Sequence, residues 1–199
     1  LIVWTRLSLA QAMINVKNHI LTFLRFTAIF SSLNCYVVYA HDMPPVLVNQ
    51  DFTVQMEDEA VTLGERWTDD VARKIEVPIE GYFVGEVPFD GTHYKFYQHQ
   101  KAGFDIYVSN LWWDKVDRNV DDYIVSQITL TTGEGKTPRG IHVGSTAREL
   151  SNAYGKGQME NDAGEQWCFY QLGNKLLSFG IKDSKVVTIT MNYDNGAQE

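Results

Sequence analysis

WCFYQLGNKLLSFGI, residues 167–181, reads as a strand, a short turn and a second strand. The earlier stretch YKFYQHQKAGFDIYV, residues 94–108, has the same design. The triplet Phe-Tyr-Gln is identical in both, and its Gln lies seven residues before a matching position in the next apolar strand each time. The two stretches indicate an internal duplication, and the expected fold depends on it.

The same order of elements recurs around each hairpin. Residues 61–64 (VTLG) match residues 141–144 (IHVG), and each segment leads into an amphipathic stretch with helical spacing. Apolar strands at 123–130 and 186–191 close the two halves. The sequence therefore predicts an α+β fold, in which two tandem repeats of one helix plus three antiparallel strands form one curved sheet with helices on one face.

Capping residues mark where the two helices begin. Thr68 is the expected N-cap of the first helix, because it precedes two acidic residues and an apolar stripe. Thr146 and Glu149 have the spacing of a capping box for the second helix, and Gly155 supplies its C-terminal stop.

The first forty residues contain no Asp or Glu. Basic residues precede an apolar run at 26–38, and Val-Tyr-Ala at 38–40 fits a signal-peptidase cleavage site. We therefore expect an exported bacterial protein that begins at His41 and is periplasmic or secreted. The run is short and interrupted by polar residues, so membrane attachment is expected only through an uncleaved signal.

These patterns divide the chain into segments. Residues before Met13 precede a natural start and are interpreted as an upstream or misassigned piece. Gly133, Gly135 and Pro138 break the pattern between the repeats. The expected order is an upstream segment at 1–12, signal peptide at 13–40, extended lead-in at 41–60, first repeat at 61–132, linker at 133–138, second repeat at 139–191 and polar tail at 192–199.

The chain is acidic, with a formal net charge of −8. The leader carries three of the 17 basic residues, so its removal makes the rest more acidic still. Nucleic acids and anionic membranes bind clustered Lys and Arg, and the composition argues against both as partners. A basic partner protein suits this charge, although acidic surfaces also serve solubility alone. The sequence leaves the oligomeric state open.

Strand alternation assigns one sheet face to the core and leaves the other open. On the predicted open face lie Tyr97, His99, Asp105, Tyr107, Gln127 and Thr129 in the first half, and Cys168, Tyr170, Ser178, Thr188 and Thr190 in the second. Tyr beside small hydroxyl side chains is typical of wet, specific protein interfaces. A merely solvated sheet face has the same composition.

Trp112 and Trp113 are a second candidate, because adjacent residues of an extended segment cannot both face the core. One of them is an interface anchor, or one caps the core while the other packs on the charged loop. The predicted partner-binding residues are Tyr97, His99, Asp105, Tyr107, Trp112, Trp113 and Tyr170.

No group of residues indicates catalysis. Residues 133–137 lack the first Gly of a phosphate-binding loop, because Leu130 holds that position. The histidines lack metal-ligand spacing, and no basic residue near Cys168 in sequence would activate its thiol. We therefore expect no enzyme activity, no cofactor and no metal.

Residues 139–191 resemble one repeat of the β-lactamase inhibitor protein-like fold, through the Gly144-Ser145-Thr146 lead-in to the helix and the aromatic hairpin at 167–181. The small lipoprotein of the outer-membrane barrel assembly machinery has a similar unit, and residues 61–130 resemble it more loosely. The resemblance implies tandem helix-plus-sheet repeats that bind partner proteins on the concave side of one sheet.

The expected function is therefore binding of another protein through the open sheet face, as an inhibitor, immunity or envelope-associated protein. A peptidoglycan or glycan module that uses exposed Trp and Tyr is the first alternative. A structural envelope component is the second. Salt separates the first two, because the on-rate of an acidic protein-binding surface falls as salt rises, whereas aromatic glycan contacts survive.

Overall fold

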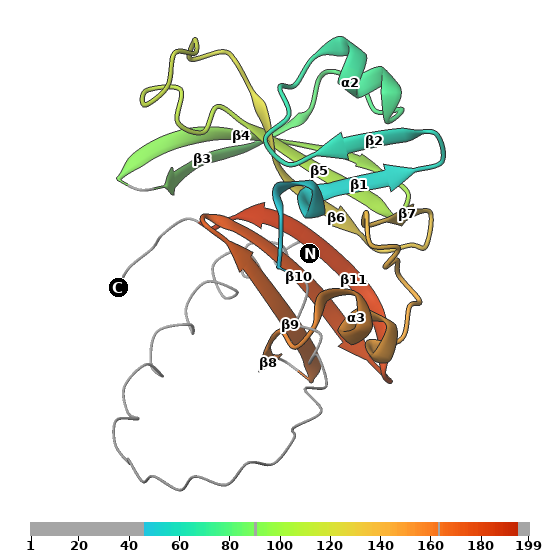
Figure 1. Cartoon of the computed structure of the whole chain (residues 1–199). Coiled ribbons are helices and arrows are strands. Elements are labelled where there is room, and N and C mark those ends of the chain that lie inside the picture. The colour runs from blue at the N-terminus through green and yellow to red at the C-terminus, as the bar shows by residue number, and fades with distance from the viewer. Residues whose placement is uncertain (1–45, 90, 163, 195–199) are drawn as a thin grey trace, which may run out of the picture. The chain divides into compact units, whose positions relative to one another are not determined.

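The computed structural model describes residues 46–89, 91–162 and 164–194 (Figure 1). These residues belong to the compact unit Pro44–Glu199. The predicted upstream segment at 1–12, the signal peptide at 13–40 and the end of the polar tail lie outside them. Within the described residues, none of the helices has the length and apolarity needed to cross a membrane.

One eight-stranded antiparallel sheet dominates the described chain, with the order β3-β4-β5-β6-β11-β10-β9-β8 (Figure 1). Strands β6 and β11 pair where the two halves meet. Each half is therefore a four-stranded meander within one sheet. The strands are β3 Tyr82–Phe89, β4 Thr92–Lys101, β5 Phe104–Ser109, β6 Ile124–Leu130, β8 Gln158–Asp162, β9 Glu165–Leu172, β10 Lys175–Lys182 and β11 Lys185–Tyr193.

A second, three-stranded sheet has the order β2-β1-β7. It comprises β1 Thr53–Met56, β2 Glu59–Thr62 and β7 Gly135–Lys136, and a single 3-10 turn, η1 Asn49–Phe52, precedes it. A Cβ added to Gly135 would lie 3.0 Å from Leu130 and 3.1 Å from Val54. The small sheet therefore packs closely against the face of the large sheet that carries Leu130.

The two α-helices among the described residues are short. Helix α2 spans Asp69–Lys74, and helix α3 spans Ala147–Tyr154. The predicted caps are confirmed: the Thr68 side chain accepts a hydrogen bond from the Val71 amide, and Thr146 and Glu149 form a reciprocal capping box. The two helices bury only a few side chains each, among them Val71 and Leu150.

The predicted α+β class is wrong, because the described fold is mostly β. The helical spacing correctly predicts both helices. However, α2 has only six residues and α3 only eight, which is too few to form a helical layer. Each half also has four strands rather than three. Strand β8 has the sequence QMEND, which lacks the apolar alternation that predicts a strand.

The two halves have equivalent hydrogen bonds as well as the same order of strands. The Gly64 amide donates to the Val125 carbonyl oxygen at 2.8 Å, and the Gly144 amide donates to the Val186 carbonyl oxygen at the same distance. In both halves the last strand returns a hydrogen bond to the residue after that glycine. A register shift also recurs between the last two strands of each half, after Tyr107 in β5 and after Gly180 in β10.

Candidate functional site

The predicted open face is wrong for Tyr97, His99, Cys168 and Tyr170. In the ladder of β4 and β5, His99 pairs with Ile106 and Tyr97 pairs with Val108. Directly paired residues of antiparallel strands share a face, and Ile106 and Val108 are buried in the core. Tyr97 and His99 therefore lie on the core face.

The cause is the length of the hairpin turns. Lys101 pairs with Phe104, so two residues connect β4 to β5, and Leu172 pairs with Lys175, so two residues connect β9 to β10. A two-residue turn pairs odd-numbered with even-numbered positions, whereas the predicted faces joined even with even in the first hairpin and odd with odd in the second. Phe96 and Phe169 consequently leave the core face, and the neighbouring tyrosines enter it.

Tyr170 and Cys168 are structural in this arrangement. The Tyr170 hydroxyl donates to the Gly155 carbonyl oxygen at 2.9 Å, and its ring contacts Tyr154 and Phe179. Cys168 is buried, and this burial raises the pKa of its thiol. A buried thiol with a raised pKa is a poor nucleophile.

Asp105 and Tyr107 do lie on the open face, where they pair with Thr129 and Gln127. Partial burial raises the pKa of the Asp105 carboxyl group, and burial followed by the charge of Asp105 raises the pKa of Tyr107. On the same face in the second half, the Trp167 and Phe169 rings are nearly parallel, with an interplanar angle of 20° and centroids 6.3 Å apart.

Trp112 and Trp113 are both half-buried. The Trp112 ring packs edge-on against Phe89 and Tyr193, with centroids 5.7 Å and 4.7 Å away. Trp112 also has a φ of 58°, which turns the chain so that the pair does not follow strand alternation. Trp112 therefore caps the core, as one of the two sequence interpretations held.

Tyr97 and His99 meet residues that the sequence did not single out, in a pocket of about 340 Å³ that opens to solvent. Its ring-bearing walls come from three segments: Trp67 before α2, Tyr97 and His99 on β4, and Tyr123 before β6. Residues 79–81 and Val108 complete the lining. We call this the aromatic pocket.

His99 fixes one wall of the aromatic pocket. Its Nδ1 lies 2.8 Å from the Pro78 carbonyl oxygen, which only accepts, so Nδ1 carries the proton and donates. Its Nε2 is buried without a hydrogen-bond partner, and a Cβ on Gly81 would lie 2.5 Å from it. Burial lowers the pKa of His99, so the ring is neutral at pH 7.

The remaining rings are held by mutual contacts. The Trp67 ring lies 4.5 Å from His99, and its indole N–H donates to the Ile79 carbonyl oxygen. Tyr97 and Tyr123 meet at 5.4 Å with an interplanar angle of 89°. Burial, followed by the neighbouring Tyr97, raises the pKa of Tyr123 to about 12, so the Tyr123 phenol is protonated at pH 7.

An exposed apolar edge adjoins the aromatic pocket. Strand β3 is an end strand of the large sheet, so one side of its backbone pairs with no strand in the described part. Tyr82, Phe83 and Val84, which we call the β3 edge, are 76%, 48% and 40% exposed. Ile79 of the pocket lining is also exposed.

The two ends of the sheet differ. Edge strands usually carry charges, Pro or bulges that block pairing with another chain. Strand β3 has a bulge at Val84, where the register shifts between Phe83 and Gly85, but its charged residue and its proline, Glu86 and Pro88, lie only in its second part. Strand β8 at the opposite end carries Glu160 and Asp162. The β3 edge is therefore the less protected end.

The sequence predicts a strand at Tyr82–Val84, but it does not reveal that these residues are exposed. Three consecutive apolar residues between Gly81 and Gly85 show no alternation of apolar and polar side chains. That pattern is typical of a strand that is covered on both faces, or of an exposed strand that binds a partner. The sequence places Trp67 only in the first amphipathic stretch and Tyr123 only at the start of the strand at 123–130. Their meeting depends on long-range packing, which sequence spacing does not reveal.

In the described residues, no three His, Cys, Asp or Glu side chains lie together in a way that would hold a metal ion. No family model matches the sequence, and no curated protein sequence matches it.

Among solved structures, the chain is similar to a cysteine-rich secretory protein from Staphylococcus aureus subsp. aureus Mu50. The identity is 14% and the TM-score 0.39, over 66% of this chain and 44% of that one. The match thus spans less than half of the other chain, and a likeness this weak carries no argument. The resemblance to the β-lactamase inhibitor protein-like fold stays a prediction.

Proposed function

We propose that the chain is an exported bacterial binding protein, which takes up an extended segment of a partner protein along the β3 edge. The observation that carries the proposal is the run Tyr82-Phe83-Val84, exposed on an end strand whose outer backbone side has no described partner. The signal-like pattern at 13–40 supports export.

An extended segment is the partner conformation that this edge fits. Adding a strand to a sheet edge satisfies the free amides and carbonyls of both chains, while alternate side chains contact the flanking pockets. The aromatic pocket lies directly beside the β3 edge, since Gly81 of its lining precedes Tyr82. It is therefore placed to receive one side chain of the added segment.

Charge favours a basic partner. Glu80 and Glu86 flank the β3 edge and are exposed, and the chain is acidic overall. Complementary charge steers association and makes the on-rate fall with rising salt. The proposal keeps the predicted kind of partner and moves the contact surface from the sheet face to its edge.

The test is an affinity capture from bacterial envelope extracts, with the full chain as bait. A second bait carries Tyr82→Lys and Val84→Lys, which place charges on the exposed edge. The matched control is Met159→Lys, because Met159 is 44% exposed on the opposite edge strand β8. Circular dichroism and thermal unfolding establish that all three baits are folded.

The proposal expects one protein that the wild-type and Met159→Lys baits retain and the double variant loses. The interaction is then reproduced with the purified partner at two salt concentrations. Retention by all three baits contradicts the edge as the binding surface. A wild-type bait that retains no protein contradicts protein binding altogether.

Glycan binding is a second candidate, favoured by the near-parallel Trp167 and Phe169 rings on the open face. Such a pair resembles a stacking platform for sugar rings. This alternative expects salt-insensitive retention on peptidoglycan, lost in Trp167→Ala and unchanged in the β3 double variant. Equal retention of wild type and Trp167→Ala excludes that platform.

A further inference from the structure

We propose that the aromatic pocket is a binding site for an organic cation, such as a lysine ammonium, an arginine guanidinium or a quaternary ammonium group. This inference deepens the proposed function, because the cation would be supplied by the segment that docks on the β3 edge.

The walls of the pocket are suited to a cation. The faces of Trp and Tyr rings are electron-rich and attract ammonium and guanidinium groups. Trp67, Tyr97 and Tyr123 all line the pocket, and the Tyr97 and Tyr123 rings meet at 89°. Rings at right angles form a corner, so that a cation entering between them contacts more than one aromatic surface.

The charge of the pocket lining also favours a cation as the ligand. Glu80 is the acidic residue in the lining, and the described lining contains no Lys or Arg. Glu80 is therefore the carboxylate that an incoming cation meets in the lining, and the negative charge of Asp121 also acts on Tyr123. The Tyr123 phenol, whose pKa is raised by burial, is protonated at pH 7 and adds no charge of its own.

The charge of His99 also matters, because a charged imidazole would repel a cationic ligand. Its Nδ1–H is engaged by the Pro78 carbonyl oxygen, and its Nε2 is covered by Gly81. A second proton would be placed at Nε2, where no acceptor lies within reach. The ring therefore serves as a neutral wall. An apolar side chain is the competing occupant, and it would make no use of Glu80.

The test titrates the full chain with choline and with N-acetyl-lysine methylamide. Their neutral isosteres are 3,3-dimethylbutan-1-ol and N-acetyl-norleucine methylamide. The signal is the NMR resonance of the Trp67 indole N–H, assigned by its loss in Trp67→Phe. We expect saturable shifts with the cations and affinities roughly tenfold weaker for the isosteres.

The variants identify the groups responsible. Glu80→Gln changes an exposed residue, so the fold is kept, and we expect roughly fivefold weaker cation binding. Tyr123→Leu is expected to weaken it similarly, and Met159→Lys is expected to leave it unchanged. Equal binding of cation and isostere, or no saturable shift with either cation, overturns the proposal.

Two further results relate this site to the proposed function. Tighter binding of the lysine probe indicates a partner side chain as the source, and tighter binding of choline indicates a quaternary ammonium group. Tyr82→Lys with Val84→Lys lies outside the pocket lining. If that variant keeps cation binding but also keeps the captured partner, the edge proposal fails and the cation site stands.

Discussion

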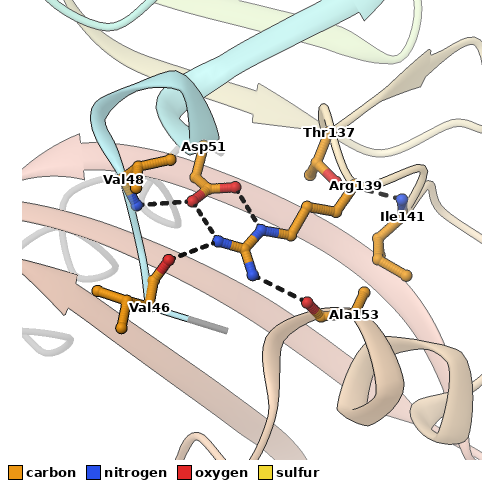
Figure 2. Close-up of polar contacts among 7 residues, drawn as sticks. All are labelled: Val46, Val48, Asp51, Thr137, Arg139, Ile141 and Ala153. Atoms are coloured by element: carbon orange, nitrogen blue, oxygen red, sulfur yellow. Dashed lines mark hydrogen bonds and ion pairs between the residues drawn. The ribbon is translucent and has the colours of Figure 1, made fainter. Parts of the chain in front are cut away.

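Arg139 holds Asp51 in a two-point ion pair across 88 positions of sequence (Figure 2). Its Nε lies 2.6 Å from Oδ1, and its Nη2 lies 2.7 Å from Oδ2. The guanidinium also donates to the carbonyl oxygens of Val46 and Ala153 and lies over the Tyr154 ring. One side chain thereby joins the segment before β1 to helix α3.

Replacing Arg139 is expected to destabilise the fold severely. Asp51 is 2% exposed, so Arg139→Met leaves a buried carboxylate without its cation, which costs about 3 kcal/mol or more. Arg139→Lys is expected to recover part of this, because an ammonium keeps the charge but lacks the planar fork. Urea denaturation followed by circular dichroism measures both.

The double variant Asp51→Asn/Arg139→Met provides the control. Because the two side chains are direct partners, its loss of unfolding free energy should be smaller than the sum of the two single losses by about 1 kcal/mol or more. Additive single effects would show that the ion pair does not couple the two segments.

The capping box of α3 gives a smaller, local prediction. Thr146 Oγ1 accepts from the Glu149 amide at 3.1 Å, and the Glu149 carboxylate accepts from the Thr146 amide at 2.7 Å. The bond that the carboxylate accepts from the Thr146 amide, followed by one from the Thr146 hydroxyl at 2.9 Å, lowers the pKa of Glu149. Thr146→Ala is expected to reduce the unfolding free energy by about 1 kcal/mol. Thr68→Ala, which removes a single 3.3 Å bond at α2, should cost less, and a larger loss there would contradict the comparison.

Local patterns in this chain predicted local features well. The caps at Thr68 and Thr146 depend on residues three positions apart, so the sequence contains the whole interaction. Strand positions in both hairpins followed from apolar alternation. The predicted faces failed because one uncounted turn residue reverses every assignment along a strand, and so His99 was placed on the wrong side.

The candidate site could be predicted only in part. Tyr97 and His99 were singled out, but for the open face of the sheet, which their register excludes. Their neighbours Trp67 and Tyr123 come from the approach to α2 and the start of β6, and no spacing rule links those positions. Fold class failed for a similar reason, since β8 and β7 are strands through pairing rather than composition.

Cys168 is expected to be unreactive in the folded protein. In a Cys35→Ser background, Cys168 is the remaining thiol, and burial both raises its pKa and blocks reagent access. Labelling with Ellman's reagent at pH 8 should be roughly a hundredfold slower than in denaturing urea, because it requires local opening. Rapid labelling without denaturant would show that the thiol is accessible and reopen a chemical role for it.

His99 is expected to make the fold less stable in acid. Burial lowers its pKa in the folded chain from the ordinary value of 6.5, and the Pro78 bond only partly opposes this. Above pH 6.5 the ring is neutral in both states and contributes no pH dependence. Below pH 6.5 the unfolded chain takes up a proton that the folded chain resists, so stability falls by up to about 1.4 kcal/mol per pH unit until the folded pKa is reached.

The measurement is the unfolding free energy from pH 7.5 to pH 5 for wild type and His99→Asn, whose amide can still donate to Pro78. The variant should be less stable at pH 7.5, because the ring contact with Trp67 at 4.5 Å is lost. The difference between the two proteins should then shrink steadily as the pH falls below 6.5. His142→Asn, at an exposed position, controls for losing a histidine in general. If the difference in unfolding free energy between wild type and His99→Asn stays constant across this range, His99 accepts its second proton without cost. Its Nε2 would then have to find an acceptor by moving away from Gly81.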